Sequence, residues 1–138
     1  MNISAHITNR SGEHTVVLST NGREHSLAIP PRSEGSGSSA NGGELLFLAL
    51  ATCYCNDIYR EAAKRGIEVE SVEVEVSGEF GVPGEPARNV SYRANVAAKA
   101  EQRKILDLMR HTDSVAEIQN TLRRSAEVVL AVCNAQSV

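Results

Sequence analysis

The residues best suited to chemistry in this sequence are its three cysteines, Cys53, Cys55 and Cys133. A cysteine thiolate is a nucleophile and a metal ligand, whereas a buried thiol often acts only as a small apolar side chain. An odd number of cysteines, two of them one residue apart, does not fit the disulfide framework of a small secreted domain. The sulfurs are therefore either inert core residues or reactive thiols, and we expect a cytoplasmic protein.

Cys53 falls inside a predicted helix from Glu44 to Arg65, a stretch that contains no proline or glycine. Residues 45–51 are apolar at every position, so we expect this part of the helix to be buried on all sides. Polar and charged residues enter from Asn56 onward, which predicts that the helix leaves the core there. Two positions along a helix turn a side chain by about 200°, so Cys53 and Cys55 face different sides and cannot join in a disulfide.

The elements before this helix are predicted from alternating apolar residues, the mark of half-buried strands. Three strands are expected at 3–8, 15–20 and 24–29, and Asn21-Gly22 is a residue pair typical of a tight hairpin turn. These strands predict an antiparallel meander. The glycine- and serine-rich stretch 32–43 that follows predicts a mobile loop.

The elements after the helix predict a second pair of strands and two helices. Glu70-Ser71 interrupts the alternation in the first of these strands, which predicts a bulge, and a cap for the last helix is expected at Asp113 or Ser114. The segregated order of strands and helices predicts one α+β domain over residues 1–138, with antiparallel sheets packed on a long, buried central helix. The expected ranges are strands at 67–80 and 90–96, helices at 101–111 and 114–124, and a closing strand at 126–132.

Charge and composition argue against several classes of partner. The formal net charge is −3 and the basic residues are scattered, which disfavours nucleic acid. No apolar run approaches the roughly 20 residues of a membrane helix. The four histidines lack ligand spacing, so no metal is expected, and no cofactor is predicted. Aromatic residues make up only 4% of the chain, and a shared core in a homodimer would compensate for this shortage.

Three short motifs in a fixed order give the chain a resemblance to a known family. They are Glu44-Leu45-Leu46, then Ala51-Thr52-Cys53-Tyr54-Cys55, and then Gly66-Ile67-Glu68-Val69. In this combination they resemble the OsmC/Ohr family of osmotically inducible and organic hydroperoxide resistance proteins. The resemblance implies an OsmC-like fold, an intertwined homodimer, and thiol-dependent reduction of hydroperoxides in oxidative-stress defence.

The same resemblance implies roles for individual residues. Cys53 matches the cysteine whose thiolate attacks the peroxide. Arg10, or else Arg32, matches the arginine that favours this thiolate. Glu44 matches a glutamate that orients the arginine, although in the well-studied peroxidases the acidic residue lies one position earlier, where this sequence has Gly43. The simpler alternatives are that both arginines are solvated surface charges and that Glu44 complements the helix dipole.

The chain departs from the family at the second cysteine, which resolves the oxidised form of the first. The matching segment is Ala116–Leu122, and it has no thiol. Closing a catalytic cycle would then require an external thiol reductant, or Cys133 acting from elsewhere. Two functions follow: a one-cysteine hydroperoxide reductase, or a non-catalytic protein that binds a small apolar or thiol-bearing ligand at the dimer interface.

Overall fold

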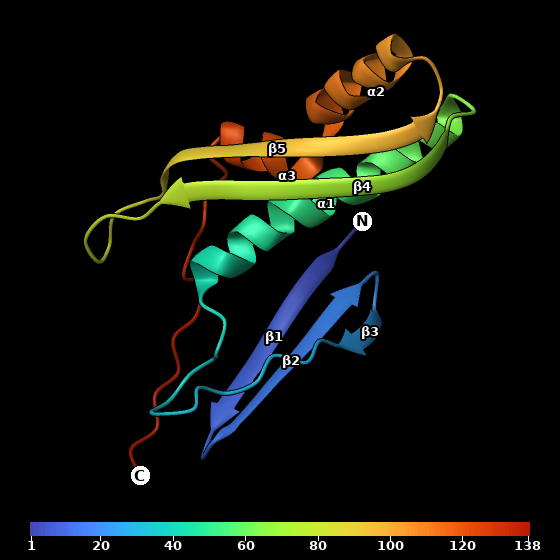
Figure 1. The fold of residues 1–138 in the computed structure, drawn as a ribbon. Coiled ribbons are helices and arrows are strands. Elements are labelled where there is room, and N and C mark those ends of the chain that lie inside the picture. The colour runs from blue at the N-terminus through green and yellow to red at the C-terminus, as the bar shows by residue number, and fades with distance from the viewer. The chain divides into compact units, whose positions relative to one another are not determined.

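The computed structural model describes residues 1–138 and divides them into two compact units, Met1–Leu46 and Phe47–Val138. The first unit contains an antiparallel sheet in the order β1-β2-β3, seen in blue in Figure 1. Asn21 and Gly22 both have positive φ, 50° and 78°, as a two-residue hairpin turn requires. The predicted meander is confirmed. Its strands are β1 Ile3–Arg10, β2 Glu13–Thr20 and β3 Arg23–Ser26.

The glycine- and serine-rich loop has more internal order than its composition predicts. The amide of Arg32 donates to the Gly37 carbonyl at 3.0 Å, and the amide of Ser39 donates to the Pro30 carbonyl at 2.9 Å. Pro31 and Ser38 form an isolated antiparallel bridge between these two bonds. The middle of the loop is thus a closed turn.

Helix α1, Gly42–Lys64, follows this loop and begins with a reciprocal cap. The Glu44 amide donates to Asn41 Oδ1 at 2.9 Å, and the Asn41 amide donates to Glu44 Oε2 at 2.8 Å. This arrangement is a capping box, in which two side chains satisfy backbone donors that the first turn leaves free. Glu44 therefore has a defined structural task at the start of the helix.

The second unit is built on a long antiparallel ribbon of β4, Glu68–Glu79, and β5, Arg88–Lys99. The register slips between Val69 and Ser71, which confirms the predicted bulge, and slips again between Ser77 and Glu79. Two helices complete the unit, α2 Gln102–Val115 and α3 Glu117–Arg123 (Figure 1). The fold class is α+β, as predicted. No helix in the structure is both long and apolar enough to cross a bilayer.

The core of the second unit lies between helix α1, helix α2 and one face of the ribbon. Tyr54, Ile58 and Ala62 of α1 meet Leu108 of α2 there. The opposite face of the ribbon carries exposed glutamates, and Glu68, Glu75 and Glu79 pair with cations across the strands. Such cross-strand pairs support the register. The partly buried residues around this core are Ile67, Val69, Val72, Val74, Tyr92, Ala94, Val96 and Met109.

Burial along α1 differs from the sequence prediction. The stretch 45–51 was expected to be buried on all sides, but its side chains other than Leu50 are partly or largely exposed, and Leu48 is 55% exposed. The buried positions instead run from Leu50 to Ala62. They recur every three or four residues, because the ribbon and α2 cover only one side of the helix.

Two predictions for the end of the chain are wrong. No strand forms at 126–132, where Val128 and Leu130 are 95% and 81% exposed. An apolar β-branched run becomes a strand only where another strand edge accepts its backbone hydrogen bonds, and none pairs with it in this chain. The break before the last helix falls at Ala116 and not at Asp113 or Ser114, and no side chain caps it.

Candidate active site

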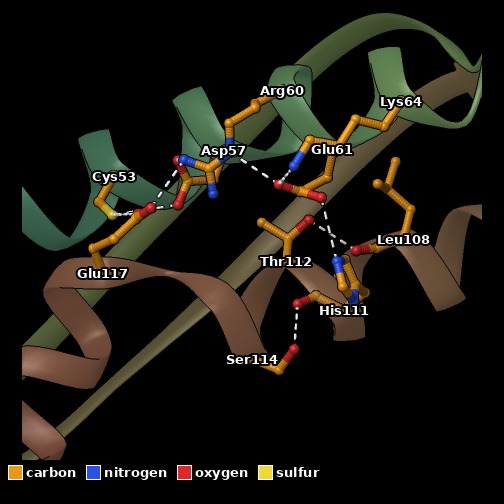
Figure 2. A network of polar contacts seen from close by, with 10 residues as sticks. All are labelled: Cys53, Asp57, Arg60, Glu61, Lys64, Leu108, His111, Thr112, Ser114 and Glu117. Carbon is orange, nitrogen blue, oxygen red and sulfur yellow. Dashed lines mark hydrogen bonds and ion pairs between the residues drawn. The ribbon is translucent and has the colours of Figure 1, made fainter.

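One face of α1 carries a cysteine, a carboxyl group and a guanidinium group close together. Cys53, Asp57 and Arg60 are spaced at i, i+4 and i+7, which places them on the same side of the helix. Glu117, the first residue of α3, meets them from the opposite side, as Figure 2 shows. We call Cys53, Asp57, Arg60 and Glu117 the thiol cluster. Two packed helices therefore position it.

The Cys53 thiol is half-buried and faces both carboxyl groups. Its Sγ atom lies 3.6 Å from Asp57 Oδ2 and 3.7 Å from Glu117 Oε2, with the sulfur as donor in each contact. Burial raises the pKa of the Cys53 thiol; the backbone of Ile118 opposes this change and the charges of Asp57 and Glu117 add to it. The resting form of Cys53 at neutral pH is therefore the protonated thiol.

Arg60 joins the two carboxyl groups of the thiol cluster. Its Nη1 atom lies 2.8 Å from Asp57 Oδ1 and 3.0 Å from Glu117 Oε1. Burial, followed by a hydrogen bond to Glu117, raises the pKa of Asp57. The pKa of Glu117 is lowered, mainly by a hydrogen bond from the backbone amide of Glu117 itself. Partial burial opposes this shift, and Asp57 and Arg60 add to it. Glu117 is thus the more acidic member of the pair.

A second group of charges adjoins the thiol cluster around the buried carboxylate of Glu61. Arg60 Nε and Lys64 Nζ each lie 2.9 Å from Glu61 Oε1, and His111 Nε2 lies 3.2 Å from Glu61 Oε2. Hydrogen bonds from Lys64 and then Arg60 lower the pKa of Glu61 to about 2. This network connects α2 to α1 (Figure 2). Arg60 links it to Asp57 and Glu117, which in turn contact the Cys53 thiol.

Three atoms of the thiol cluster have the spacing of metal ligands. Cys53 Sγ and one carboxylate oxygen each of Asp57 and Glu117 lie within 4.8 Å of one another. Arg60 already pairs with both carboxyl groups, and its charge would compete with a bound cation. The sequence predicts no metal here, and the arrangement is better explained as a set of ion pairs.

The other site residues predicted from the sequence lie in the first unit. Arg10 ends β1 and faces Glu13 in the strand register. Arg32 Nε donates to the Ser38 carbonyl at 3.3 Å within the closed turn, and Glu44 caps α1. The action of Arg10 or Arg32 on Cys53, and of Glu44 on an arginine, stays a prediction.

Sequence reasoning missed three members of the thiol cluster. Asp57 and Arg60 were interpreted only as charges marking the point where the helix leaves the core, yet Asp57 is buried. Their spacing from Cys53 was the available signal. Glu117 lies 64 positions from Cys53 in the chain, and only the packing of α3 on α1 brings the two together.

Three further positions bear on the thiol chemistry of the chain. Ala116, the position that the family resemblance matches to the second cysteine, is fully buried and directly precedes Glu117, so its segment lies against Cys53. Cys55 is half-buried on α1, and Cys133 is exposed in the irregular C-terminal segment. All three cysteines are free thiols.

Comparison with known proteins identifies the family. The fold is that of an OsmC-like α+β protein, and the family model described as OsmC-like protein matches residues 35–131. The chain belongs to this family. No curated protein matches the sequence.

Solved structures show the same fold at low sequence identity. An OsmC-like protein from Mycoplasma pneumoniae is 16% identical, with 89% of each chain covered and a TM-score of 0.61. An organic hydroperoxide resistance protein OsmC from Legionella pneumophila is 24% identical, with 88% of each chain covered and a TM-score of 0.53. The organic hydroperoxide resistance protein OhrB of Bacillus subtilis is 16% identical, covering 87% of this chain and 90% of its own, with a TM-score of 0.52.

The Glu61 network predicts a pH-dependent contribution to stability. Because the pKa of Glu61 falls from 4.5 to about 2 on folding, its contribution is present above pH 4.5 and is lost as the pH falls toward 2. Glu61→Gln should therefore lower the free energy of unfolding at pH 7, and the deficit should shrink between pH 5 and pH 3. Urea unfolding at several pH values measures this, with the exposed Glu70→Gln as control. An equal deficit at every pH would contradict it.

Proposed function

We propose that this protein is a cytoplasmic, thiol-dependent hydroperoxide reductase of oxidative-stress defence, with Cys53 as the attacking residue. The observation that carries the proposal is the place of Cys53: a free, half-buried thiol on α1, within the part of the chain that matches the family model. Its sulfur faces two carboxyl groups that can handle protons. The structural neighbours from Legionella and Bacillus are organic hydroperoxide resistance proteins, which adds support.

The proposed cycle needs one cysteine and an external thiol. The sulfur attacks the terminal peroxide oxygen, the O–O bond breaks, and an alcohol leaves while Cys53 becomes a sulfenic acid. A small external thiol then condenses with the sulfenic acid, releasing water and forming a mixed disulfide. A second thiol reduces this disulfide and restores Cys53. No metal or cofactor takes part, and nucleic acid and membranes are not proposed as partners.

A binding protein without catalysis is the second candidate, and the raised pKa of the Cys53 thiol favours it. An open groove of about 510 Å³ between β5 and α2 could hold a small apolar ligand. Apolar side chains of Ala94, Val96, Ile105, Leu106 and Met109 line part of it. Binding of an organic hydroperoxide that the protein does not consume would favour this candidate over a reductase.

We also propose that the active form is an intertwined homodimer. Leu48 on the first half of α1 and Val128 and Leu130 in the C-terminal segment are largely exposed, and a second copy could bury them. Light scattering at micromolar concentration should give twice the mass of one chain. A stable, folded monomer under the same conditions would contradict the proposal.

The two cysteines of α1 should differ in their effect on peroxide reduction. Cys53→Ser should abolish peroxide consumption because it removes the nucleophile, whereas Cys55→Ser should leave the rate largely intact because Cys55 projects from another side of the helix. Stopped-flow measurement with an organic hydroperoxide and excess small thiol gives both rates. Loss of activity in Cys55→Ser alone would reassign the reactive cysteine.

Ala116→Cys should restore the missing second thiol. Its neighbour Glu117 contacts Cys53 Sγ at 3.7 Å, so the new side chain should come within bridging range, which requires Cα atoms closer than about 7 Å. After peroxide treatment we expect a 53–116 disulfide in the variant and over-oxidised Cys53 in the natural protein. Non-reducing peptide mapping shows which forms. A disulfide between Cys53 and Cys133 in the natural protein, or free thiols at both positions in the variant, would contradict this expectation.

A further inference from the structure

Reduction of a peroxide by Cys53 requires a proton to move in two directions. The thiol must lose its proton to attack. The oxygen that leaves the peroxide must gain one, because an alkoxide is a poor leaving group and an alcohol is a better one. The half-buried sulfur contacts no cation; its charged neighbours are the carboxyl groups of Asp57 and Glu117. These groups do not stabilise a thiolate, but either of them can carry a proton.

We propose that Glu117 is the acid–base residue of this site: it takes the proton of the Cys53 thiol and returns it to the oxygen that leaves the peroxide. This inference rests on the proposed reductase function. It adds to that function a residue on α3 and a route for the proton.

The geometry of Glu117 suits both halves of the transfer. Its Oε2 atom lies 3.7 Å from Cys53 Sγ, near enough for a thiol hydrogen bond. Its side chain is 61% exposed, so the carboxyl group lies at the solvent side of the thiol, where a substrate must arrive. Asp57, by contrast, is buried on α1 and cannot follow a leaving group into solvent.

The surrounding charges keep Glu117 ionised, which is the form that can accept a proton. Arg60 at 3.0 Å stabilises its ionised form, and Asp57 hydrogen-bonds to it as the partner that retains a proton more readily. No other charged side chain contacts the thiol. Glu61, Lys64 and His111 lie beyond Arg60 and reach the cluster only through it.

Cys53 thiol and Glu117 carboxylate become thiolate and carboxylic acid, and the thiolate sulfur forms a bond to the terminal peroxide oxygen. The O–O bond breaks and its electron pair leaves with the alkoxide oxygen. Glu117 then gives its proton to that oxygen, so the products are a sulfenic acid, an alcohol and the original carboxylate. Sulfur is oxidised by two electrons and the peroxide is reduced by two.

The pH dependence of the natural protein is the first test. If the proton passes within the Cys53–Glu117 pair, the number of protons on the pair stays constant between the two pKa values, which lie below 4.5 for Glu117 and above 9.0 for Cys53. The second-order rate constant for an organic hydroperoxide should then be nearly flat from pH 6 to pH 8. A tenfold rise per pH unit, as expected when free thiolate alone reacts, would overturn the proposal.

Glu117→Gln is the second test, because two mechanisms predict opposite signs for it. Removing this negative charge favours the thiolate, so a simple thiolate mechanism predicts a faster reaction. Removing the acid–base residue predicts a peroxide reaction about 100-fold slower at pH 7, the low end of general acid–base effects, and a rate that rises with pH. Alkylation of Cys53 by iodoacetamide, whose leaving group needs no proton, should be unchanged or faster in the same variant.

Controls separate this inference from the proposed function. Glu70→Gln, an exposed glutamate on the ribbon outside the thiol cluster, should match the natural protein in both reactions. A natural protein that consumes no peroxide would overturn the reductase function and the role of Glu117 together. A natural protein that consumes peroxide, with Glu117→Gln equally fast or faster, would overturn the role of Glu117 alone.

Discussion

The packing of one face of α1 against the ribbon determines most of the second unit. Tyr54, Ile58 and Ala62 are spaced four residues apart and fill the core with Leu108 of α2. This apolar row fixes the rotation of the helix about its axis. The next row, with Cys53, Asp57 and Glu61, must then face the junction with α2 and α3 (Figure 2). The chemistry of the thiol is thus set by the same contacts that stabilise the fold.

That junction gives Cys53 an unusual environment for its proposed role as a nucleophile. A cation beside a thiol lowers its pKa, yet Arg60 lies on the far side of two carboxyl groups and pairs with them instead. Burial and negative charge together hold the thiol in its protonated form. The proposed role of Glu117 would let Cys53 react by moving a proton at the moment of attack, without a stored thiolate.

The solved relatives show how much sequence change this fold accepts. At 16% to 24% identity they retain it over nearly the whole chain. What such a fold needs is the alternation of apolar and polar residues along the strands and the apolar row on α1, and many sequences provide these. Glu117 contacts the Cys53 thiol and directly follows the buried Ala116, so under the proposed function the residues at these two positions would tune the chemistry of the site.

The sequence alone determined the fold class and the elements up to the start of α2, because hydrophobic periodicity, the Asn21-Gly22 turn and the break at Glu70 are local signals. It also singled out Cys53. Only the tertiary structure decided which side of α1 is buried and which charges meet the sulfur, since Glu117 arrives from 64 residues away. The same reason explains the missing strand at 126–132: an apolar run predicts a strand, but pairing with another strand edge, a non-local event, decides whether it forms.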